Sequence, residues 1–162
     1  MDSFALNCII GVAAIVLLVW AAVVINRIIN RKKLKDTMER LAKTYQAQVD
    51  EFDYTGNFII AIDKRQALVF FQKRKSENET KEVVDLKGFV KCEMMAFTRP
   101  AANGSIIHDS IILTFIPPDK QARTTKLELY NSDTDALDIN DELVLGKKWE
   151  KLANEIIKSL RR

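Results

Sequence analysis

Cysteine, histidine, proline and glycine are all scarce in this chain of 162 residues, which contains two, one, three and five of them respectively. Cys8 lies inside an apolar run and Cys92 far along the chain, so one chain cannot build a disulfide framework or a multi-cysteine metal site. So few glycines leave little material for a phosphate-binding loop, and the CxxC, HExxH and GxSxG motifs are absent. We therefore expect no cofactor, no metal and a protein that is not an enzyme.

Excess positive charge is also missing from most of the chain. The net charge is +3, and it comes from segment 27–43, where seven basic residues oppose only Asp36 and Glu39. From Thr44 onward, acidic and basic residues nearly cancel. Because binding to DNA or RNA requires a broad basic face, we expect no nucleic-acid partner.

What the sequence does contain is one long uncharged run, from Phe4 to Ile25. As a helix rising about 1.5 Å per residue, this run would be about 33 Å long, enough to cross the core of a bilayer. Apolar residues cover every face of that helix, which argues against a helix lying in the membrane interface. A cleaved signal peptide would have basic residues before the run, whereas here Asp2 precedes it. We predict a single transmembrane anchor over residues 1–30.

Basic residues follow the predicted span directly. Lysine and arginine next to a span are retained on the cytoplasmic side, so we expect the N-terminus outside and the C-terminal domain in the cytoplasm. The same residues are candidates for contact with anionic headgroups at the membrane surface. They are Arg27, Arg31, Lys32, Lys33 and Lys35. Small residues such as Gly11 and Ala14 would let a second helix approach, so homo-oligomerisation stays open, although no GxxxG motif is present.

Segment 31–56 has the pattern of a basic juxtamembrane amphipathic helix. Its apolar residues recur at spacings of three and four through about Asp53, and Gly56 is a suitable stop. They are Leu34, Met38, Leu41, Tyr45 and Phe52. The pattern is too short, and too interrupted at Gln48, for a coiled coil. We expect this helix to pack on the domain that follows.

Short β-rich runs replace the helical spacing after Gly56, and a final helix closes the chain. The expected strands cover residues 58–62, 67–71, 83–86, 90–97, 106–116 and 126–130. Residues 63–66 predict a hairpin turn, and Leu127 and Leu129 should point inward. The helix carries one apolar stripe, which must cover something apolar. Its members are Leu145, Trp149, Leu152, Ala153, Ile156 and Leu160. For residues 57–162 we expect an α+β fold, a small antiparallel sheet or barrel capped by this helix.

Three features together resemble a known superfold. They are the opening hairpin of residues 58–63 and 68–71, the Val84-Asp85-Leu86 strand before Val90, and Trp149 in the last helix. From Phe58 to Leu160 the chain is similar to the pleckstrin-homology-like (PH-like) domains of bacterial membrane-associated proteins, in which two bent antiparallel sheets are capped by a C-terminal helix. The resemblance implies this fold and a place at the bacterial inner membrane.

The resemblance does not extend to lipid-headgroup recognition. Eukaryotic members that bind phosphoinositides place spaced lysines and arginines around the first hairpin. Here that turn offers only Lys64 and Arg65, with further basic residues at 73–75, one strand later.

Candidate site residues are few, and each has a plain structural interpretation. His108 alternates onto the same strand face as Ser110 and Thr114, which we expect to be the wetter face, and it lacks an obvious nucleophile. Cys92 alternates with apolar residues and should be a small core residue. Four aspartates before the last helix lack the spacing of a calcium loop, so helix entry and solubility explain them better. They are Asp133, Asp135, Asp138 and Asp141.

These observations favour a membrane-anchored, non-catalytic interaction or scaffold domain that binds an unknown protein partner at the cytoplasmic face. One alternative is a sensor of anionic lipid or of envelope stress, in which the basic cluster and residues 73–75 contact headgroups. The other is a small-molecule binder or enzyme acting near the membrane, which would need a deep pocket lined by convergent polar groups.

Overall fold

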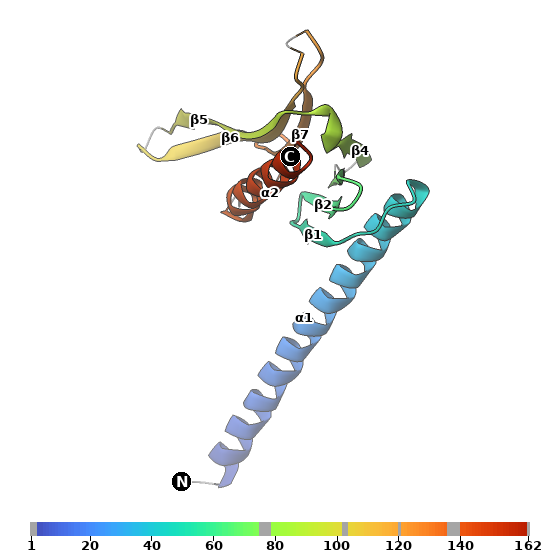
Figure 1. The fold of residues 1–162 in the computed structure, drawn as a ribbon. Helices are drawn as coiled ribbons and strands as arrows, with labels where there is room; N and C mark the ends of the chain where they lie inside the picture. The colour runs from blue at the N-terminus through green and yellow to red at the C-terminus, as the bar shows by residue number, and fades with distance from the viewer. Residues whose placement is uncertain (1–2, 75–78, 102–103, 120, 136–139, 162) are drawn as a thin grey trace. The chain divides into compact units, whose positions relative to one another are not determined.

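The computed structural model divides the chain into two compact units, residues 1–37 and residues 38–162. It describes the backbone of residues 3–74, 79–101, 104–119, 121–135 and 140–161. The side chains of residues 1–16, 27, 74, 79 and 140 lie outside the description. The fold class is α+β, with two antiparallel sheets and a C-terminal helix, as expected (Figure 1).

Helix α1 covers Ser3–Thr44. The first unit consists of most of this helix, and the second unit begins within its last turns. Side chains 4–16 of the predicted span fall outside the described residues. Within the part of the chain that the structure describes, no helix is both long enough and apolar enough to cross a membrane.

The prediction that the amphipathic helix of segment 31–56 continues through about Asp53 is wrong. Gln46 adopts a left-handed conformation with φ of 54°, which ends the helix. The amides of Gln46 and Ala47 close the last turn by donating to the carbonyls of Lys43 and Ala42, at 3.0 Å each. The spacing of the apolar residues is compatible with one continuous helix. It is equally compatible with a helix that ends at Thr44, a turn, and a strand over Glu51–Tyr54.

The first sheet contains four strands in the order β1-β2-β3-β4. They are β1 (Glu51–Tyr54), β2 (Phe58–Asp63), β3 (Leu68–Arg74) and β4 (Glu79–Asp85). Strand β1 was missing from the sequence prediction, which had six strands. In Glu51-Phe52-Asp53-Tyr54 acidic and aromatic residues alternate, and the segment pairs with β2 from Glu51 against Ile62 to Tyr54 against Ile59. This alternation with a period of two is typical of a strand, and the prediction of a helix through about Asp53 overlooked it.

The predicted hairpin turn is confirmed one residue later than expected, at residues 64–67, and Asp63 holds it. Its carboxylate accepts from the amide of Gln66 at 2.7 Å and from the amide of Gln48 at 2.8 Å. Burial by itself would raise the pKa of Asp63, but these hydrogen bonds outweigh it and lower the pKa below its usual value. Ala67 closes the turn with φ of 59°.

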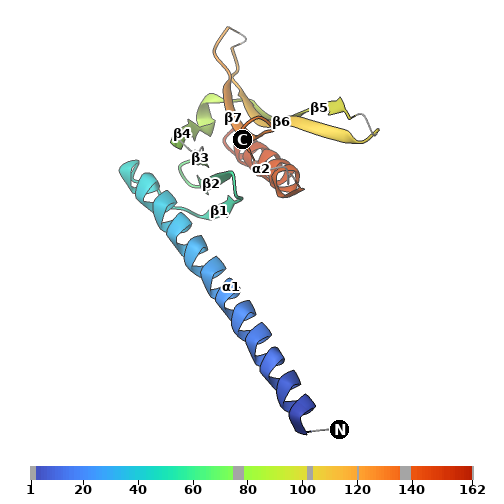
Figure 2. The same cartoon turned by 180° about the vertical axis from the view of Figure 1, so that it is seen from behind.

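The second sheet contains three strands in the order β5-β6-β7. They are β5 (Lys91–Pro100), β6 (Ile106–Ile116) and β7 (Thr125–Asn131). The short helix η1 (Leu86–Gly88) joins the sheets, and Asp85 caps it by accepting from the amide of Lys87 at 3.0 Å. Figures 1 and 2 show the β5–β6 hairpin extending away from the rest of the second sheet.

Helix α2 (Asn140–Ser159) covers the inner side of the second sheet, as its apolar stripe predicts. Trp149, Ala153 and Ile156 are buried in the core, whereas Leu160 at the end of the stripe is 44% exposed. The two inward leucines of β7 are confirmed, since Leu127 and Leu129 are 0% and 1% exposed. Apolar residues from both sheets and α2 therefore form one core.

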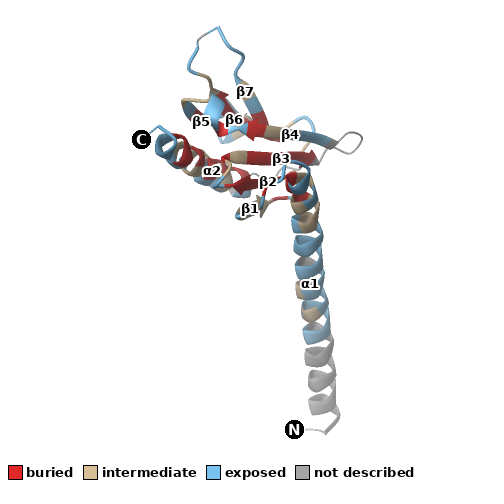
Figure 3. Ribbon diagram, turned by 45° about the vertical axis from the view of Figure 1, so that its right-hand side comes forward, coloured by how far each residue is buried: buried red, intermediate tan, exposed pale blue. Residues whose placement is uncertain are grey.

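The first sheet has a second buried face, which points away from this core. Ile59, Ala61 and Phe70 are at most 1% exposed, yet they lie outside the core shared by the two sheets. The segment between α1 and β1 supplies a cover: Ala47 is buried there, and the ring of Tyr45 lies 5.9 Å from that of Phe70. Figure 3 accordingly shows β2 and β3 largely in the colour of buried residues.

Candidate interaction surfaces

The predicted membrane-contact residues lie on α1. Four of them are exposed, namely Arg31, Lys32, Lys33 and Lys35. The side chain of the fifth, Arg27, lies outside the described residues. Large apolar side chains just before them are exposed too, including Leu18 at 70% and Trp20 at 66%. The described part of α1 thus presents apolar and then basic side chains to its surroundings.

An ion-pair cluster holds α2 against the edge of the first sheet. Asp53 of β1 accepts from the indole nitrogen of the buried Trp149 at 2.9 Å and pairs with Lys148 at 2.6 Å. Lys148 also lies 2.8 Å from Glu51, whose other oxygen is 3.0 Å from Lys64. Hydrogen bonds and charge from these two lysines outweigh partial burial and hold the pKa of Glu51 below its ordinary value. The cluster joins β1, α2 and the β2–β3 turn.

A second cluster joins the two sheets through a buried lysine. The side chain of Lys73 at the end of β3 is 3% exposed, and its Nζ lies 2.6 Å from Glu128 of β7 and 3.0 Å from Asp135. Asn131 donates its amide to Asp135 at 2.7 Å and its side chain to Glu128 at 3.1 Å. The sequence analysis did not predict this cluster. Lys73 continues the alternation of the inward residues Val69 and Phe71, and this pattern could have indicated that its side chain points inward.

The four predicted aspartates do not act together. Asp135 is buried in the lysine cluster, Asp133 is exposed in the turn after β7, and Asp141 lies in the first turn of α2, as helix entry predicts. Asp138 lies outside the described residues. In the part of the chain that is described, no group of three or more His, Cys, Asp and Glu side chains is placed to hold a metal ion.

The histidine and cysteine candidates lie apart in sheet register. Cys92 is buried in the core, as predicted, and its burial raises the pKa of the thiol to about 12. The prediction of a wetter face for Thr114 is wrong, since Thr114 is 3% exposed with no partner for its hydroxyl among the described residues. Thr114 sits on the middle strand, where Glu93 and Lys126 flank it on both sides. His108 is half-buried, nearer the tip of the β5–β6 hairpin.

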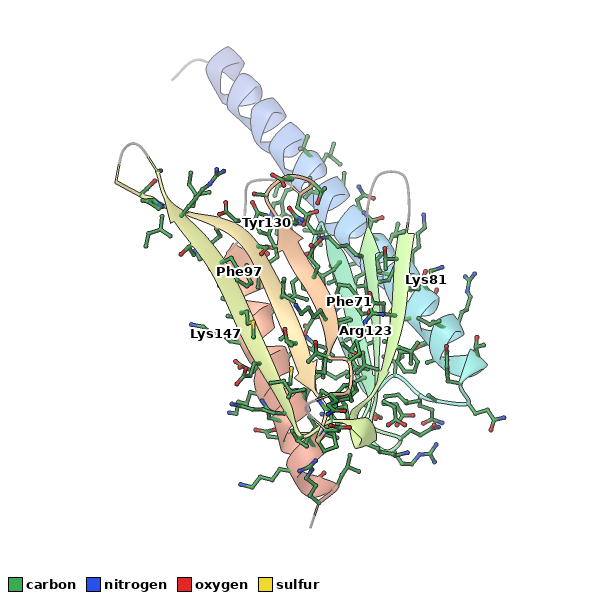
Figure 4. The ribbon with its side chains drawn as sticks, turned by 90° about the horizontal axis from the view of Figure 1, so that it is seen from above. Phe71, Lys81, Phe97, Arg123, Tyr130 and Lys147 are labelled. Carbon is green, nitrogen blue, oxygen red and sulfur yellow. The ribbon has the colours of Figure 1, made fainter. Side chains whose placement is uncertain are left out.

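Open clefts lie between described residues at the surface of the second unit. One, about 540 Å³, lies between Glu82 of β4 and residues 123–126 at the start of β7, and burial raises the pKa of Glu82. A polar cleft of about 400 Å³ includes the Arg99–Asp109 ion pair and Glu128. Another, about 280 Å³, lies along the end of α1 and residues 47–49. Arg123 lines the first cleft, and Figure 4 labels it together with Phe71, which lies between the sheets.

The outer edge of β5 is covered for only part of its length. The side-chain amide of Asn154 on α2 bonds both the amide and the carbonyl of Cys92, at 2.9 and 2.8 Å, and Glu150 accepts from the amide of Met94 at 3.0 Å. Asn154 lies outside the apolar stripe that the sequence predicts for α2, and this role was missed. From Met95 to Pro100 every side chain of β5 is exposed, including Phe97 at 52%.

Comparison with known protein families, with curated proteins and with solved structures finds no match to this chain.

Proposed function

We propose that this protein is a membrane-anchored, non-catalytic interaction domain of PH-like fold, held at the cytoplasmic face of a bacterial inner membrane to bind a protein partner. Helix α1 is the anchor, with the uncharged run from Phe4 to Ile25 in the bilayer. The basic residues that follow support a cytoplasmic position for the domain.

The observation that carries the proposal is the exposure of apolar side chains around α1. Leu17, Leu18 and Val19 are successive residues, so they point in different directions around the helix, and they are 65%, 70% and 59% exposed. In water, apolar surface of this extent is unfavourable, at about 25 cal/mol per Å². Lipid on all sides of the helix removes that cost.

An interaction role for the domain is supported by its filled interior. Aromatic and aliphatic side chains from both sheets and α2 occupy the space where a barrel-like fold would hold a small ligand, including Phe71, Phe115 and Trp149. The described clefts are open and lie at strand edges and loops. A partner would therefore bind on the surface of the domain. The anchor would raise the local concentration of the domain at the membrane.

A lipid-binding role is the second candidate, because Arg31, Lys32, Lys33 and Lys35 are exposed directly after the apolar run. Each lysine or arginine near an anionic surface contributes about 1 kcal/mol. Replacing Lys32 and Lys33 by glutamate separates the two functions. A lipid sensor would lose contact with vesicles containing phosphatidylglycerol, whereas an interaction domain would retain its partner binding.

Membrane fractionation tests the anchor. In the variant Ala14→Lys/Leu17→Lys, two charges stand near the middle of the run, at about 3 kcal/mol each. We expect the full-length wild type to stay in the membrane pellet after carbonate extraction and this variant to move to the supernatant. The matched control is Ile28→Lys/Ile29→Lys, which adds the same charge beyond the run and should stay in the pellet. Wild type in the supernatant would refute the proposal.

A further inference from the structure

The free part of the β5 edge is short and sharply bounded. The amides of Cys92 and Met94 donate to side chains of α2, so the N–H and C=O groups of even-numbered residues of β5 point away from β6. Those of odd-numbered residues point toward β6. On the far side of the hairpin bulge the same order holds, because the amide of Ala101 bonds the carbonyl of Ser105. At the outward position 100 the chain has proline, which has no N–H. Among the residues that the structure describes, two outward N–H groups on the exposed part of the strand have no partner, those of Ala96 and Thr98.

The side chains on either side of these groups are apolar and accessible. Met95 and Phe97 share one face of β5, the face opposite to that of the buried Cys92, and they are 36% and 52% exposed. Arg99 continues this face and pairs with Asp109 at 2.9 Å. Seen from above in Figure 4, Phe97 lies on β5 while α2 passes beneath the strand. An open strand edge beside exposed apolar side chains is a template for adding another strand.

We propose that a second copy of this chain pairs with this edge, β5 against β5 in antiparallel orientation, with the twofold axis at Phe97. Ala96 of each copy then lies opposite Thr98 of the other. Such a pair exchanges two hydrogen bonds, and both free N–H groups of each copy find a carbonyl. The two sheets become one continuous sheet across the axis.

The neighbouring positions fit this register. Met94 lies opposite Pro100 of the second copy: the amide of Met94 is already bonded to Glu150 and proline has no N–H, so no donor is left without an acceptor. The two Phe97 side chains face each other as a non-hydrogen-bonded pair, with Cα atoms about 4.5 Å apart. Met95 faces the aliphatic part of Arg99 of the second copy.

Moving the axis to Ala96 is less favourable. Thr98 would then lie opposite Met94 of the second copy, whose amide is bonded to Glu150, so the carbonyl of Thr98 would find no strand donor. That register does bring Glu93 opposite Arg99, but Glu93 already bonds Lys91 at 2.5 Å and Arg99 bonds Asp109. Hydrogen bonding therefore favours the axis at Phe97.

The interface is small, so pairing rests on the proposed membrane anchor for its strength. Anchored copies share a plane and face one another at a raised effective concentration, which allows a weak contact to be populated. Pro100 and α2 also limit the length of the new ladder, because they stop it at its two ends.

Disulfide cross-linking of the full-length protein in its membrane tests the pairing. In a Cys8→Ser background, Phe97→Cys places two thiols across the axis within the distance that a disulfide spans. We expect mild oxidation to give at least a tenfold higher dimer yield for Phe97→Cys than for Val144→Cys, a control on α2 whose side chain is 68% exposed. Co-expressed Met95→Cys and Arg99→Cys chains should form the mixed dimer that this register predicts.

A second pair of variants tests the hydrogen bond donated by the amide of Thr98 and leaves the thiol at position 97 unchanged. Thr98→Pro in the Phe97→Cys background deletes an outward N–H and should reduce the yield to that of Val144→Cys, while Thr98→Ala should leave it unchanged. Equal yields from Phe97→Cys and Val144→Cys, or no loss with Thr98→Pro, would overturn the proposal. Carbonate extraction of the same membranes separates the causes: protein in the pellet with no cross-link rejects the pairing alone, and protein in the supernatant rejects the anchor.

Discussion

The two sheets of the domain differ in what covers their outer faces. Phe70 on the outer face of the first sheet is 0% exposed, because the segment before β1 covers it, whereas Phe97 on the outer face of the second sheet is 52% exposed. The inner faces of both sheets share one core. The difference teaches that β2 and β3 of the first sheet are buried on both faces, while β5 of the second sheet keeps part of its outer face exposed.

The largest expected effect on stability comes from replacing a phenylalanine by alanine on the outer face of each sheet in turn. We expect Phe70→Ala to lower the free energy of unfolding by about 3–5 kcal/mol, since it leaves a cavity between the sheet and Tyr45. The matched Phe97→Ala should change it by less than about 0.5 kcal/mol, because its side chain is exposed. Urea unfolding of the full-length protein in detergent, followed by circular dichroism, measures both. Equal losses would break the distinction between the sheets.

The contact between the sheets is tested next. Lys73→Met removes the cation between Glu128 and Asp135 and leaves the carboxylate of Asp135 buried at 2% exposure. Breaking a buried ion pair in this way costs about 3 kcal/mol. Lys87→Met, at an exposed position of η1, is the control and should be close to neutral. A neutral Lys73→Met in the same unfolding assay would show that the two sheets hold together without the lysine.

The contact between α2 and β1 should have a smaller effect. Asp53→Ala leaves the indole N–H of the buried Trp149 without its acceptor, and we expect a loss of about 2 kcal/mol. Glu155→Ala removes an exposed carboxylate of the same helix, whose contact with Lys151 is 4.0 Å long, and should change stability very little. If thermal unfolding gives the two variants the same midpoint, Asp53 does not hold the helix.

The smallest effect is a pH dependence at the same contact. The pKa of Glu51 is lower in the folded protein than its ordinary value of 4.5. The contribution of its ion pairs is therefore present above that value and is lost as the pH falls through the lower folded pKa. Glu51→Gln should flatten the decline of stability in this acidic range, while Glu155→Gln should follow the wild type. Parallel curves for Glu51→Gln and wild type would contradict this assignment.

Elements whose pattern had one interpretation were predictable from the sequence. The alternation of Leu127 and Leu129 with polar residues, the turn after Asp63 and the apolar stripe of α2 around Trp149 each matched the period of the element that forms. Cys92 was placed in the core for the same reason. These signals are local, so one segment of sequence was enough.

The features that were missed depend on contacts between distant segments. Strand β1 has an alternating pattern of only four residues, and the edge of β2 decides its structure. Thr114 is buried because its strand is central, which its own alternation does not reveal. Lys73 lay outside the expected strands and Asp135 was interpreted as a helix-entry charge. Only the packing of β3 against the end of β7 brings them together.

The most direct test of the central claim is the side of the membrane on which the domain lies. Protease added to intact cells, and separately to inverted membrane vesicles, should be followed with an antibody against residues 140–159. We predict that the C-terminal domain is protected in intact cells and digested in inverted vesicles. Digestion of the domain in intact cells would contradict the account.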